Sequence, residues 1–461
     1  MFSAKTYQDR RQGLIQQLNS GLVILLGNEY SSKNYKDNHF PFRQDSSFLY
    51  YIGINQAHLA ATIDIEAGET CLYGDDVSVE MIVWTGPQPN MRDLGQQSGI
   101  QSTKAYSALA TSIQAAKSAG RTIHVLPPYR PENSILLAHL LACPLSSLSE
   151  YVSTSLIKAI VHQRSIKSAE ELAEMAAAVN ISRKMHVAAM QQAQAGQIEA
   201  ELAGLVEGIA SAGGGQLSYP VILTINGQTL HNHYHGNTLQ DGQLVLGDFG
   251  AETAMGYAGD ITRTFPVAKR FSSQQKDIYE IVLEAETQVI KQIRPGIPYL
   301  DMHKLSARII TDGLKALGLM KGDTNESVEA GAHSLFFPHG LGHMIGLDVH
   351  DMEDLGEDLV GYDEQIKRNP MFGYKSLRLG RNLESGFVLT VEPGIYFIPE
   401  LIDSWRAQGL HQDFINYDKL DAYKTFGGVR IEDDVLVTDT GSEVLGDPIP
   451  KTVAEVEALR S

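Results

Sequence analysis

One acidic residue inside an apolar strand constrains the fold of this 461-residue chain more than any other feature. The run VLTVEPGIYF places Glu392 among β-branched and aromatic residues, directly before Pro393. Because a residue before proline is restricted to an extended backbone, the strand fixes the direction in which the Glu392 carboxylate points. An isolated buried carboxylate is costly. The fold must therefore supply a cation, a cluster of hydrogen bonds or an environment that raises the pKa of Glu392.

Two aspartates lie in a segment that is typical of a β-hairpin. In QLVLGDFGAETAMGYAGDITRTFPV, at residues 243–267, two β-like runs flank a glycine-rich middle. A hairpin over this segment sets Asp248 on one strand across from Asp260 on the other. Either aspartate alone could equally cap or solvate a turn, so the prediction depends on their convergence.

A fourth carboxylate comes from GGVRIEDDVLVT at residues 427–438, which alternates between apolar and polar residues. This period of two puts Arg430, Glu432 and Asp434 on the face opposite the valines and Ile431. By itself the pattern is also that of a half-exposed strand with a surface ion pair, which contributes little to stability.

Three histidines lie in FFPHGLGHMIGLDVHD, at residues 336–351. Its glycines disfavour a helix that would bring His339 and His343 together. In an extended backbone, residues four apart are separated by roughly 13 Å. This stretch can therefore give at most one histidine to any single ion. A second group, His231, His233 and His235 in LHNHYHGN, is on a turn-rich segment and could equally be an exposed loop.

These residues together form an inventory of four carboxylates and one histidine. Oxygen-rich ligation with a single imidazole suits Mn²⁺, Co²⁺ or Zn²⁺ in an arrangement of two metal ions. Two divalent cations would also balance the four carboxylates, whose clustering is otherwise unfavourable.

The composition narrows the class of protein. Only Cys71 and Cys143 are present, which excludes a disulfide framework and a cysteine-rich zinc site. The formal net charge of −18 argues against a nucleic-acid partner. No apolar run is long enough for a membrane span, and the N-terminus has no apolar secretory segment, so we expect no membrane partner and a cytoplasmic location.

The organisation of the chain predicts two domains. Up to about residue 155, the runs GLVILLG, AATIDIEAG, VEMIVWTG and TIHVLPP indicate strands and residues 106–119 a helix, giving an N-terminal α/β domain over 1–155. Residues 153–215 are rich in helix formers, and Ser168 with Glu171 fits a capping box. From residue 219 onward, segregated strands and helices over 273–293 and 300–317 predict an α+β catalytic domain, which we place at 156–461.

Taken together, the motifs resemble those of the metal-dependent pita-bread peptidases, family M24, in the branch that holds aminopeptidase P and prolidase. The resemblance spans nearly the whole chain and includes FRQDSSFLYYIG at residues 42–53 in the N-terminal domain. It implies a C-terminal pita-bread catalytic domain and two divalent ions, with Mn²⁺ expected before Co²⁺ or Zn²⁺. The five implied metal ligands lie in GDFG, YAGDITRTFP, HGLGH, TVEPG and VRIEDD; they are Asp248, Asp260, His343, Glu392 and Glu432.

The resemblance also implies roles for residues around the ions. His233, in HYHGN, and His350, in VHD, are expected to contact substrate and stabilise the reaction intermediate, with His231 as the fallback for His233. Glu392 is expected to carry a proton toward the leaving nitrogen. His339 is expected on the substrate side, and Arg430 is expected to orient Glu432. The interval from Asp248 to Asp260 is one residue longer than is usual, which predicts a longer hairpin tip near residues 254–255.

The implied activity is hydrolysis of the bond between an N-terminal residue and a following proline, in a dimer or tetramer. Arg378, in SLRLGRNL, resembles the prolidase arginine that binds the carboxylate of a dipeptide, but it could equally be a rim residue. Other segments are closer to aminopeptidase P, so we predict a Xaa-Pro aminopeptidase, with a Xaa-Pro dipeptidase as the alternative. A non-catalytic or creatinase-like protein of this fold is a remote third possibility, because such proteins typically lack the ligand set.

Overall fold

The computed structural model describes residues 1–460, which form two compact units. The first unit contains residues 1–164 together with the short stretch Glu353–Leu359. The second contains residues 165–352 and the chain from residue 360 onward. Helix α7 (Thr154–Ser165) therefore closes the first unit, a few residues beyond the boundary expected at residue 155.

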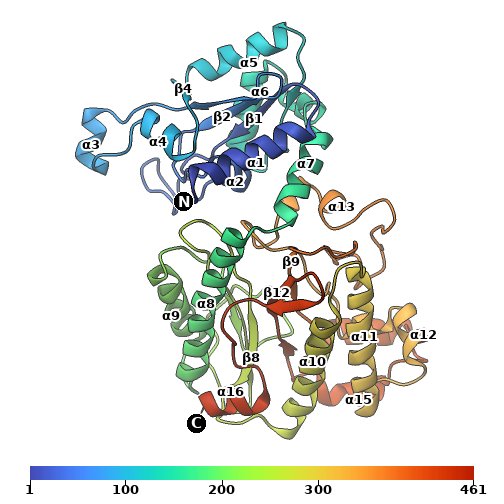
Figure 1. Cartoon of the computed structure of the whole chain (residues 1–461). Coiled ribbons are helices and arrows are strands. Elements are labelled where there is room, and N and C mark those ends of the chain that lie inside the picture. The colour runs from blue at the N-terminus through green and yellow to red at the C-terminus, as the bar shows by residue number, and fades with distance from the viewer. Residues whose placement is uncertain (461) are drawn as a thin grey trace. The chain divides into compact units, whose positions relative to one another are not determined.

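A five-stranded mixed sheet forms the centre of the first unit (Figure 1). Its order is β4-β3-β2-β1-β5, with β1, β2 and β3 antiparallel and β5 and β4 added in parallel. The strands are β1 (Leu22–Leu26), β2 (Ala60–Asp64), β3 (Glu69–Tyr73), β4 (Ser102–Lys104) and β5 (Ile123–His124). The helices are α1 (Ala4–Gln17), α2 (Ser46–Ile52), α3 (Val79–Thr85), α4 (Met91–Gln97), α5 (Ala108–Ser118), α6 (Pro131–Leu141), η1 (Leu145–Glu150) and α7.

One predicted strand of this unit is wrong, because VEMIVWTG forms helix α3. The Ser78 side chain accepts a hydrogen bond from the Met81 N–H, and Gly86 ends the helix at a φ of 73°. Val79 and Trp84 are 82% and 80% exposed. The β-branched, apolar composition suggested a covered strand, but nothing within residues 1–460 covers this run, and the capping residues at both ends fix its local structure.

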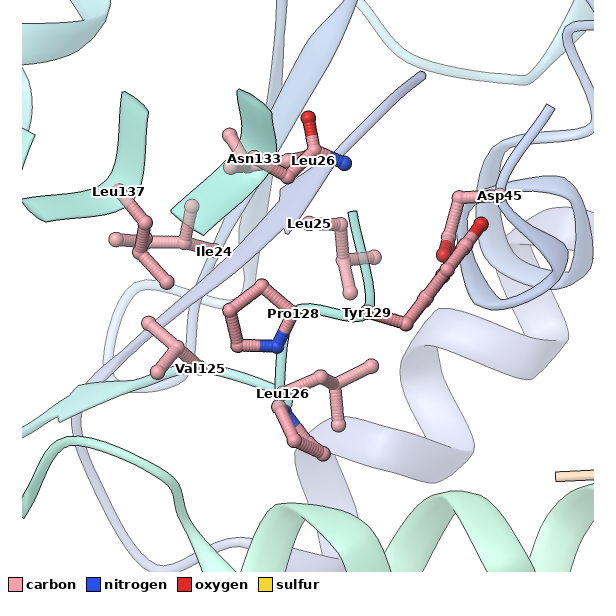
Figure 2. A pocket seen from close by; sticks show the side chains of 11 residues that line it. Ile24, Leu25, Leu26, Asp45, Val125, Leu126, Pro128, Tyr129, Asn133 and Leu137 are labelled. Carbon is pink, nitrogen blue, oxygen red and sulfur yellow. The ribbon is translucent and has the colours of Figure 1, made fainter. Parts of the chain in front are cut away.

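A small cavity of about 50 Å³ lies beside strand β1 of the first unit. Figure 2 shows apolar side chains from β1, from the segment after β5 and from α6 around it. The cavity shares no residue with the carboxylates predicted above, and its lining is mainly leucine, isoleucine, valine and proline. It is a packing feature of the α/β unit.

The second unit combines short strands with long helices (Figure 1). Its strands are β6 (Ile222–Thr224), β7 (Leu244–Asp248), β8 (Thr262–Pro266), β9 (Val388–Val391), β10 (Gly394–Tyr396), β11 (Gly428–Arg430), β12 (Asp433–Val437) and β13 (Ser442–Val444). Its main helices are α8 (Ala169–Gln192), α9 (Glu199–Ala212), α10 (Ser273–Gln292), α11 (Tyr299–Ala316), α12 (Thr324–Glu329), α14 (Pro399–Gln408), α15 (Tyr417–Leu420) and α16 (Val453–Leu459). Short turns of helix occur at η2 (Ala332–Leu335) and η4 (Asp421–Tyr423), whereas η3 (Glu353–Leu355) and most of α13 (Glu357–Val360) lie in the stretch that belongs to the first unit. The predicted helices over 273–293 and 300–317 are confirmed, as is the capping box of Ser168 and Glu171.

The strands of the second unit form three small sheets, of order β6-β7-β8, β13-β12-β9 and β10-β11. An isolated bridge between Thr262 and Glu432 connects β8 to the break between β11 and β12, and a second bridge pairs Met344, outside the strands, with Leu389 of β9. Helix α10 packs on strands of two of these sheets, and it also packs along α11. Two of the breaks between strands fall at Glu392 and Glu432. Within residues 1–460, no helix is both long and apolar enough to cross a membrane.

The β7–β8 hairpin depends on close backbone approach at its turn end, in the connection between the two strands. A Cβ atom on Gly250 would lie 1.9 Å from the Gly259 carbonyl oxygen, which is backbone and cannot move aside. We therefore expect Gly250→Ala to lower the free energy of unfolding by about 1–3 kcal/mol. Gly204→Ala is the matched control, because it lies in helix α9 with open space around its Cβ position. That variant should gain up to about 1 kcal/mol. Urea unfolding measures both, and equal effects would contradict the hairpin geometry.

Candidate metal centre

The β7–β8 hairpin brings the two predicted aspartates together. Asp248 ends β7 opposite Thr262, and Asp260 lies two residues before Thr262, so both aspartates occupy the same face of the hairpin. The Tyr219 hydroxyl lies 2.6 Å from Asp248 Oδ1 and 2.5 Å from Asp260 Oδ1. One hydroxyl proton can be donated to only one of the two carboxylates at a time, so a cation or a further proton would stabilise the pair. The turn falls at residues 254–255, as the spacing predicted.

Glu432 reaches the same face from the break between β11 and β12. Its backbone N–H donates to the Thr262 carbonyl (3.1 Å), and the Thr262 hydroxyl donates to Glu432 Oε2 (2.6 Å). Arg430 lies two residues before it and is buried as well. Val429 and Ile431 on the opposite face are fully covered too, so the alternative of a half-exposed strand with a surface ion pair does not apply.

Arg430 contacts Asp248 directly rather than Glu432. Its Nη2 donates to Asp248 Oδ2, and its Nη1 donates to the Tyr396 hydroxyl at 2.7 Å. Its Nε donates to the Thr262 hydroxyl at 3.1 Å, and that hydroxyl in turn donates to Glu432. The guanidinium therefore orients one carboxylate by direct contact and Glu432 only through Thr262.

His343 and Glu392 come from two antiparallel backbone segments. Around the bridge of Met344 with Leu389, the Thr390 N–H donates to the His343 carbonyl at 2.9 Å, and the Thr390 hydroxyl accepts from the His343 N–H at 3.1 Å. Glu392 lies in the break between β9 and β10. Its Oε1 is 3.7 Å from His343 Nε2, while Asp260 Oδ2 is 3.4 Å from the same nitrogen.

The tautomer of His343 suits a metal ligand. Its Nδ1 lies 3.0 Å from the Met344 carbonyl, to which it can only donate, and this leaves the Nε2 lone pair facing the carboxylates. Burial by itself lowers the pKa of His343, but Asp260 and Glu392 outweigh it and raise this pKa. The surroundings of Nε2 thus favour a positive charge there.

Burial and mutual repulsion perturb the carboxylates. Burial, followed by the charges of Asp260, Glu392 and Asp248, raises the pKa of Glu432 well above its usual value. Burial likewise raises the pKa of Glu392 to about 7, although His343 and Arg430 oppose this shift. Burial raises the pKa of Asp248 as well, partly offset by Arg430.

Asp260 behaves differently from the other carboxylates. Burial alone would raise its pKa, but the hydrogen bond with His343 and the charge of that imidazole lower it below its usual value. The pKa of one member of the cluster is thus lowered by its imidazole partner, while the pKa values of the other three are raised.

The donor set fits divalent cations. Ligand atoms of Asp260, His343 and Glu432 all lie within 4.8 Å of one another, and Asp248 and Glu392 flank them. Three buried carboxylates and the half-buried Glu392 gather here, and only Asp248 is in direct contact with an arginine, so the ionised cluster carries excess negative charge. Oxygen donors with one imidazole are the set that Mn²⁺, Co²⁺ and Zn²⁺ accept.

His350 and His339 occupy different sides of the cluster. The His350 ring lies 4.2 Å from the His343 ring at an angle of 64°, and its charge influences Asp260. His339 Nδ1 lies 3.7 Å from Glu392 Oε2, on a carboxylate oxygen other than the one that His343 faces. Burial and the charge of Arg430 lower the pKa of His339 to about 3, so it is neutral. His339, His343 and His350 therefore all lie near the carboxylate cluster, but each contacts a different part of it.

The second histidine group lies nearby and is more exposed. His235 Nε2 lies 3.1 Å from the Val221 carbonyl, so this side chain is used in packing. Burial lowers the pKa of His231, and the charges of Arg430, Asp248, Arg378 and His233 act on it too. His231 is thus within electrostatic reach of the cluster, beside His233, which is exposed. Arg378 is half-buried and also acts on His339.

Three side chains of the site were not singled out from the sequence. Tyr396 accepts from Arg430 and lies 2.8 Å from His339 Nε2. It is four residues after Glu392 along an extended run, so the strand period of two placed it on the same face. Thr262 lies two residues after Asp260, so the same strand period placed it on the face of Asp260. Tyr219 lies outside both patterns, and no local signal marked it.

Comparison with known proteins places these observations in a family. The model of metallopeptidase family M24 matches residues 173–439, and that of the aminopeptidase P N-terminal domain matches residues 7–124. The Xaa-Pro dipeptidase of Homo sapiens is 33% identical over 95% of this chain and 88% of its own length. The Xaa-Pro aminopeptidase of Escherichia coli K12 is 31% identical over 99% of this chain and 98% of its own length.

Solved structures agree with the sequence relatives. Aminopeptidase P from E. coli with the inhibitor Pro-Leu superposes with a TM-score of 0.82 at 29% identity, covering 100% of this chain and 98% of that one. A zinc-substituted form of E. coli aminopeptidase P in complex with product gives a TM-score of 0.81. The likeness thus extends over both units of the chain.

The contacts of Tyr219 predict a role in metal affinity. Tyr219→Phe removes the hydroxyl that lies between Asp248 and Asp260, so both carboxylates lose their shared partner. We expect Mn²⁺ binding about 10- to 100-fold weaker by isothermal titration calorimetry. Tyr279→Phe is the control, since that buried tyrosine donates to the Lys451 carbonyl and not to the cluster. Equal Mn²⁺ affinity in both variants would refute this role of Tyr219.

The raised pKa of Glu392 predicts a pH dependence for the metal-free protein. Because this pKa is about 7 in the fold and 4.5 ordinarily, the native state binds more protons than the unfolded chain between these values. The free energy of unfolding should therefore fall as the pH rises through this window. Glu392→Gln lacks this contribution. In urea unfolding with EDTA, wild type should lose stability relative to the variant between about pH 5 and 7. A constant difference would contradict the assignment.

Proposed function

The chain belongs to metallopeptidase family M24, and we propose that it hydrolyses the peptide bond between an N-terminal residue and a following proline, as a Xaa-Pro aminopeptidase. The observation that carries this proposal is the convergence of four carboxylates, three of them buried, and one histidine at one place in the second unit. The relatives that match the whole length of the chain carry the names of Xaa-Pro peptidases.

We assign the metal ions to five ligands: Asp248, Asp260, His343, Glu392 and Glu432. Two divalent cations, Mn²⁺ first and Co²⁺ or Zn²⁺ as alternatives, supply an activated water and a Lewis acid for the scissile carbonyl when bound. Tyr219, Thr262 and Arg430 orient the ligands in turn, which limits the reorganisation that ion binding would require.

Glu392 is suited to move a proton. Its side chain is 19% exposed, against 11% for Asp248 and 8% for Asp260, so it has the best access to a substrate. Its Oε2 faces His339. The lowered pKa of His339 makes that imidazole a weaker base than Glu392, so it does not take the proton from Glu392. In this mechanism Glu392 takes the proton released by the nucleophile and gives it to the leaving proline nitrogen.

The substrate-side groups surround the ligands. His350, packed on His343, donates a hydrogen bond to the carbonyl oxygen as negative charge develops on it. His233, from the segment LHNHYHGN, is the second group that contacts the substrate. His231 is the alternative, because the charges of Arg430 and Asp248 influence its pKa. Tyr396 connects Arg430 to His339 and so holds His339 beside the bound peptide.

Arg378 provides the observation that favours the second candidate, a Xaa-Pro dipeptidase. Its charge contributes to the lowered pKa values of His231 and His339, which supports a position near the substrate. A guanidinium in that place could bind the free carboxylate of a dipeptide. The relatives divide the same way, with a dipeptidase at 33% and an aminopeptidase at 31% identity. The homo-oligomer and the cytoplasmic location stay predictions.

Substrate length separates the two activities. The Mn²⁺-loaded enzyme should cleave a Xaa-Pro-Xaa-Xaa peptide with kcat/KM at least equal to that for the Xaa-Pro dipeptide, as measured by release of the first residue. Cleavage of the dipeptide alone, with a KM that Arg378→Met raises about tenfold or more, would instead establish the dipeptidase.

Three further measurements belong to the same experiment. Glu432→Gln should lose metal and nearly all turnover, whereas a variant with full turnover would refute the ligand assignment. A peptide with alanine in place of proline should be a poor substrate. A folded wild-type protein that acquires no Mn²⁺ by elemental analysis would favour the non-catalytic or creatinase-like alternative.

A further inference from the structure

A buried ion pair lies behind the segment that carries His343 and His350. Lys167 Nζ is 3.0 Å from Asp351 Oδ2, and both side chains are only 1% exposed. Taking two charges out of water is expensive, and buried pairs of this kind are therefore weak evidence for stability alone. The pair joins residues 184 positions apart in the sequence, which makes its location in the fold informative.

The Lys167 side of the pair is held by regular structure. Its backbone N–H donates to the Gly386 carbonyl at 2.8 Å, just before strand β9 begins. The next residue, Ser168, is the N-cap of the 24-residue helix α8 and is held by the reciprocal bonds of the capping box with Glu171. Lys167 therefore starts from a fixed backbone position.

The Asp351 side of the pair closes a loop. The Asp351 N–H donates to the Met344 carbonyl at 2.8 Å, and the Asp348 N–H donates to Asp351 Oδ1 at 3.3 Å. A Cβ atom on Gly346 would lie 2.6 Å from Asp351 Oδ2, so the carboxylate packs directly against that glycine. Residues 345–350 include no helix or strand, so contacts of this kind determine their path.

The two ends of this loop are functional positions. Met344 follows His343, and Asp351 follows His350, so the contacts of Asp351 bring the two histidines back to one place. Their rings lie 4.2 Å apart as a result. A shift of the Asp351 carboxylate is passed to His350 through a single peptide unit.

We propose that the ion pair of Lys167 and Asp351 is a positioning device that holds His350 against His343 for contact with the substrate carbonyl. This inference rests on the proposed peptidase function for its kinetic consequence, but not for its structural one. Lys167 and Asp351 do not touch substrate. They fix the loop from behind, and α8 and β9 supply the rigid frame. Small displacements of a catalytic group cost large factors in rate, so a buried pair is well placed to control kcat.

Lys167→Met tests the proposal by removing the charge while retaining much of the volume. We expect kcat on a Xaa-Pro peptide to fall about tenfold or more, with KM and bound Mn²⁺ changed by less than about twofold. Lys5→Met is the matched control, because Lys5 pairs with Asp9 on the surface at 75% and 61% exposure. It should leave both constants unchanged.

A structural readout makes the outcome independent of activity. In metal-free protein, the rate at which diethyl pyrocarbonate modifies His350 should rise severalfold in Lys167→Met, while the exposed His58 stays constant as an internal reference. An unchanged His350 rate would overturn the proposal. If wild type cleaves no Xaa-Pro peptide, the proposed function fails, and the labelling still decides whether the pair positions His350.

A double variant separates positioning from stability. Lys167→Met with Asp351→Leu removes both charges, so it avoids the unpaired buried charge of the single variant and should recover most of the thermal stability. The double variant also removes the Asp351 Oδ1 acceptor of the Asp348 N–H, so the loop stays unfixed, kcat should stay low and His350 should stay reactive. Recovery of wild-type kcat together with the melting temperature would show that the pair only stabilises the fold.

Discussion

The rest of the second unit depends on the burial of four carboxylates around one arginine. Asp248, Asp260, Glu392 and Glu432 are drawn together where burial and mutual repulsion push three of their four pKa values upward. Arg430 relieves part of this repulsion through Asp248, and the His343 imidazole relieves part through Asp260. Such a cluster is unfavourable unless cations balance it, and so the fold is built to hold positive charge at one place.

The fragmentation of the sheet follows from that requirement. Glu392 lies in the break between β9 and β10, Glu432 in the break between β11 and β12, and Asp260 just before β8. The backbone of a residue inside a continuous strand is hydrogen-bonded to the neighbouring strands, which fixes the direction of its side chain. At a break, the side chain can turn toward a common centre. The bridge between Thr262 and Glu432 connects the fragments at the point where the ligands meet. Short strands are thus the consequence of a shared site.

Much of this arrangement could be predicted from the strand period of two and from the cost of buried charge. The strand period predicted the hairpin and the face shared by Arg430 and Glu432, and the cost of a buried charge marked Glu392. The same period would have predicted the positions of Tyr396 and Thr262. Tyr219 could not be found this way, because it reaches Asp248 and Asp260 from 29 and 41 residues away. The run that forms α3 was wrongly expected as a strand, since composition reports burial only where another element supplies the cover.

The segment from His343 to Asp351 shows why one stretch of chain can serve two purposes. Extended pairing with β9 fixes His343 and keeps His339 on the far oxygen of Glu392, while the loop after Met344 returns His350 to the first histidine. The proposed metal ligand His343 and the proposed substrate contact His350 are then neighbours through the same backbone. The buried Lys167 pair acts on the loop at the residue after His350, which is where such coupling can be adjusted without touching a ligand.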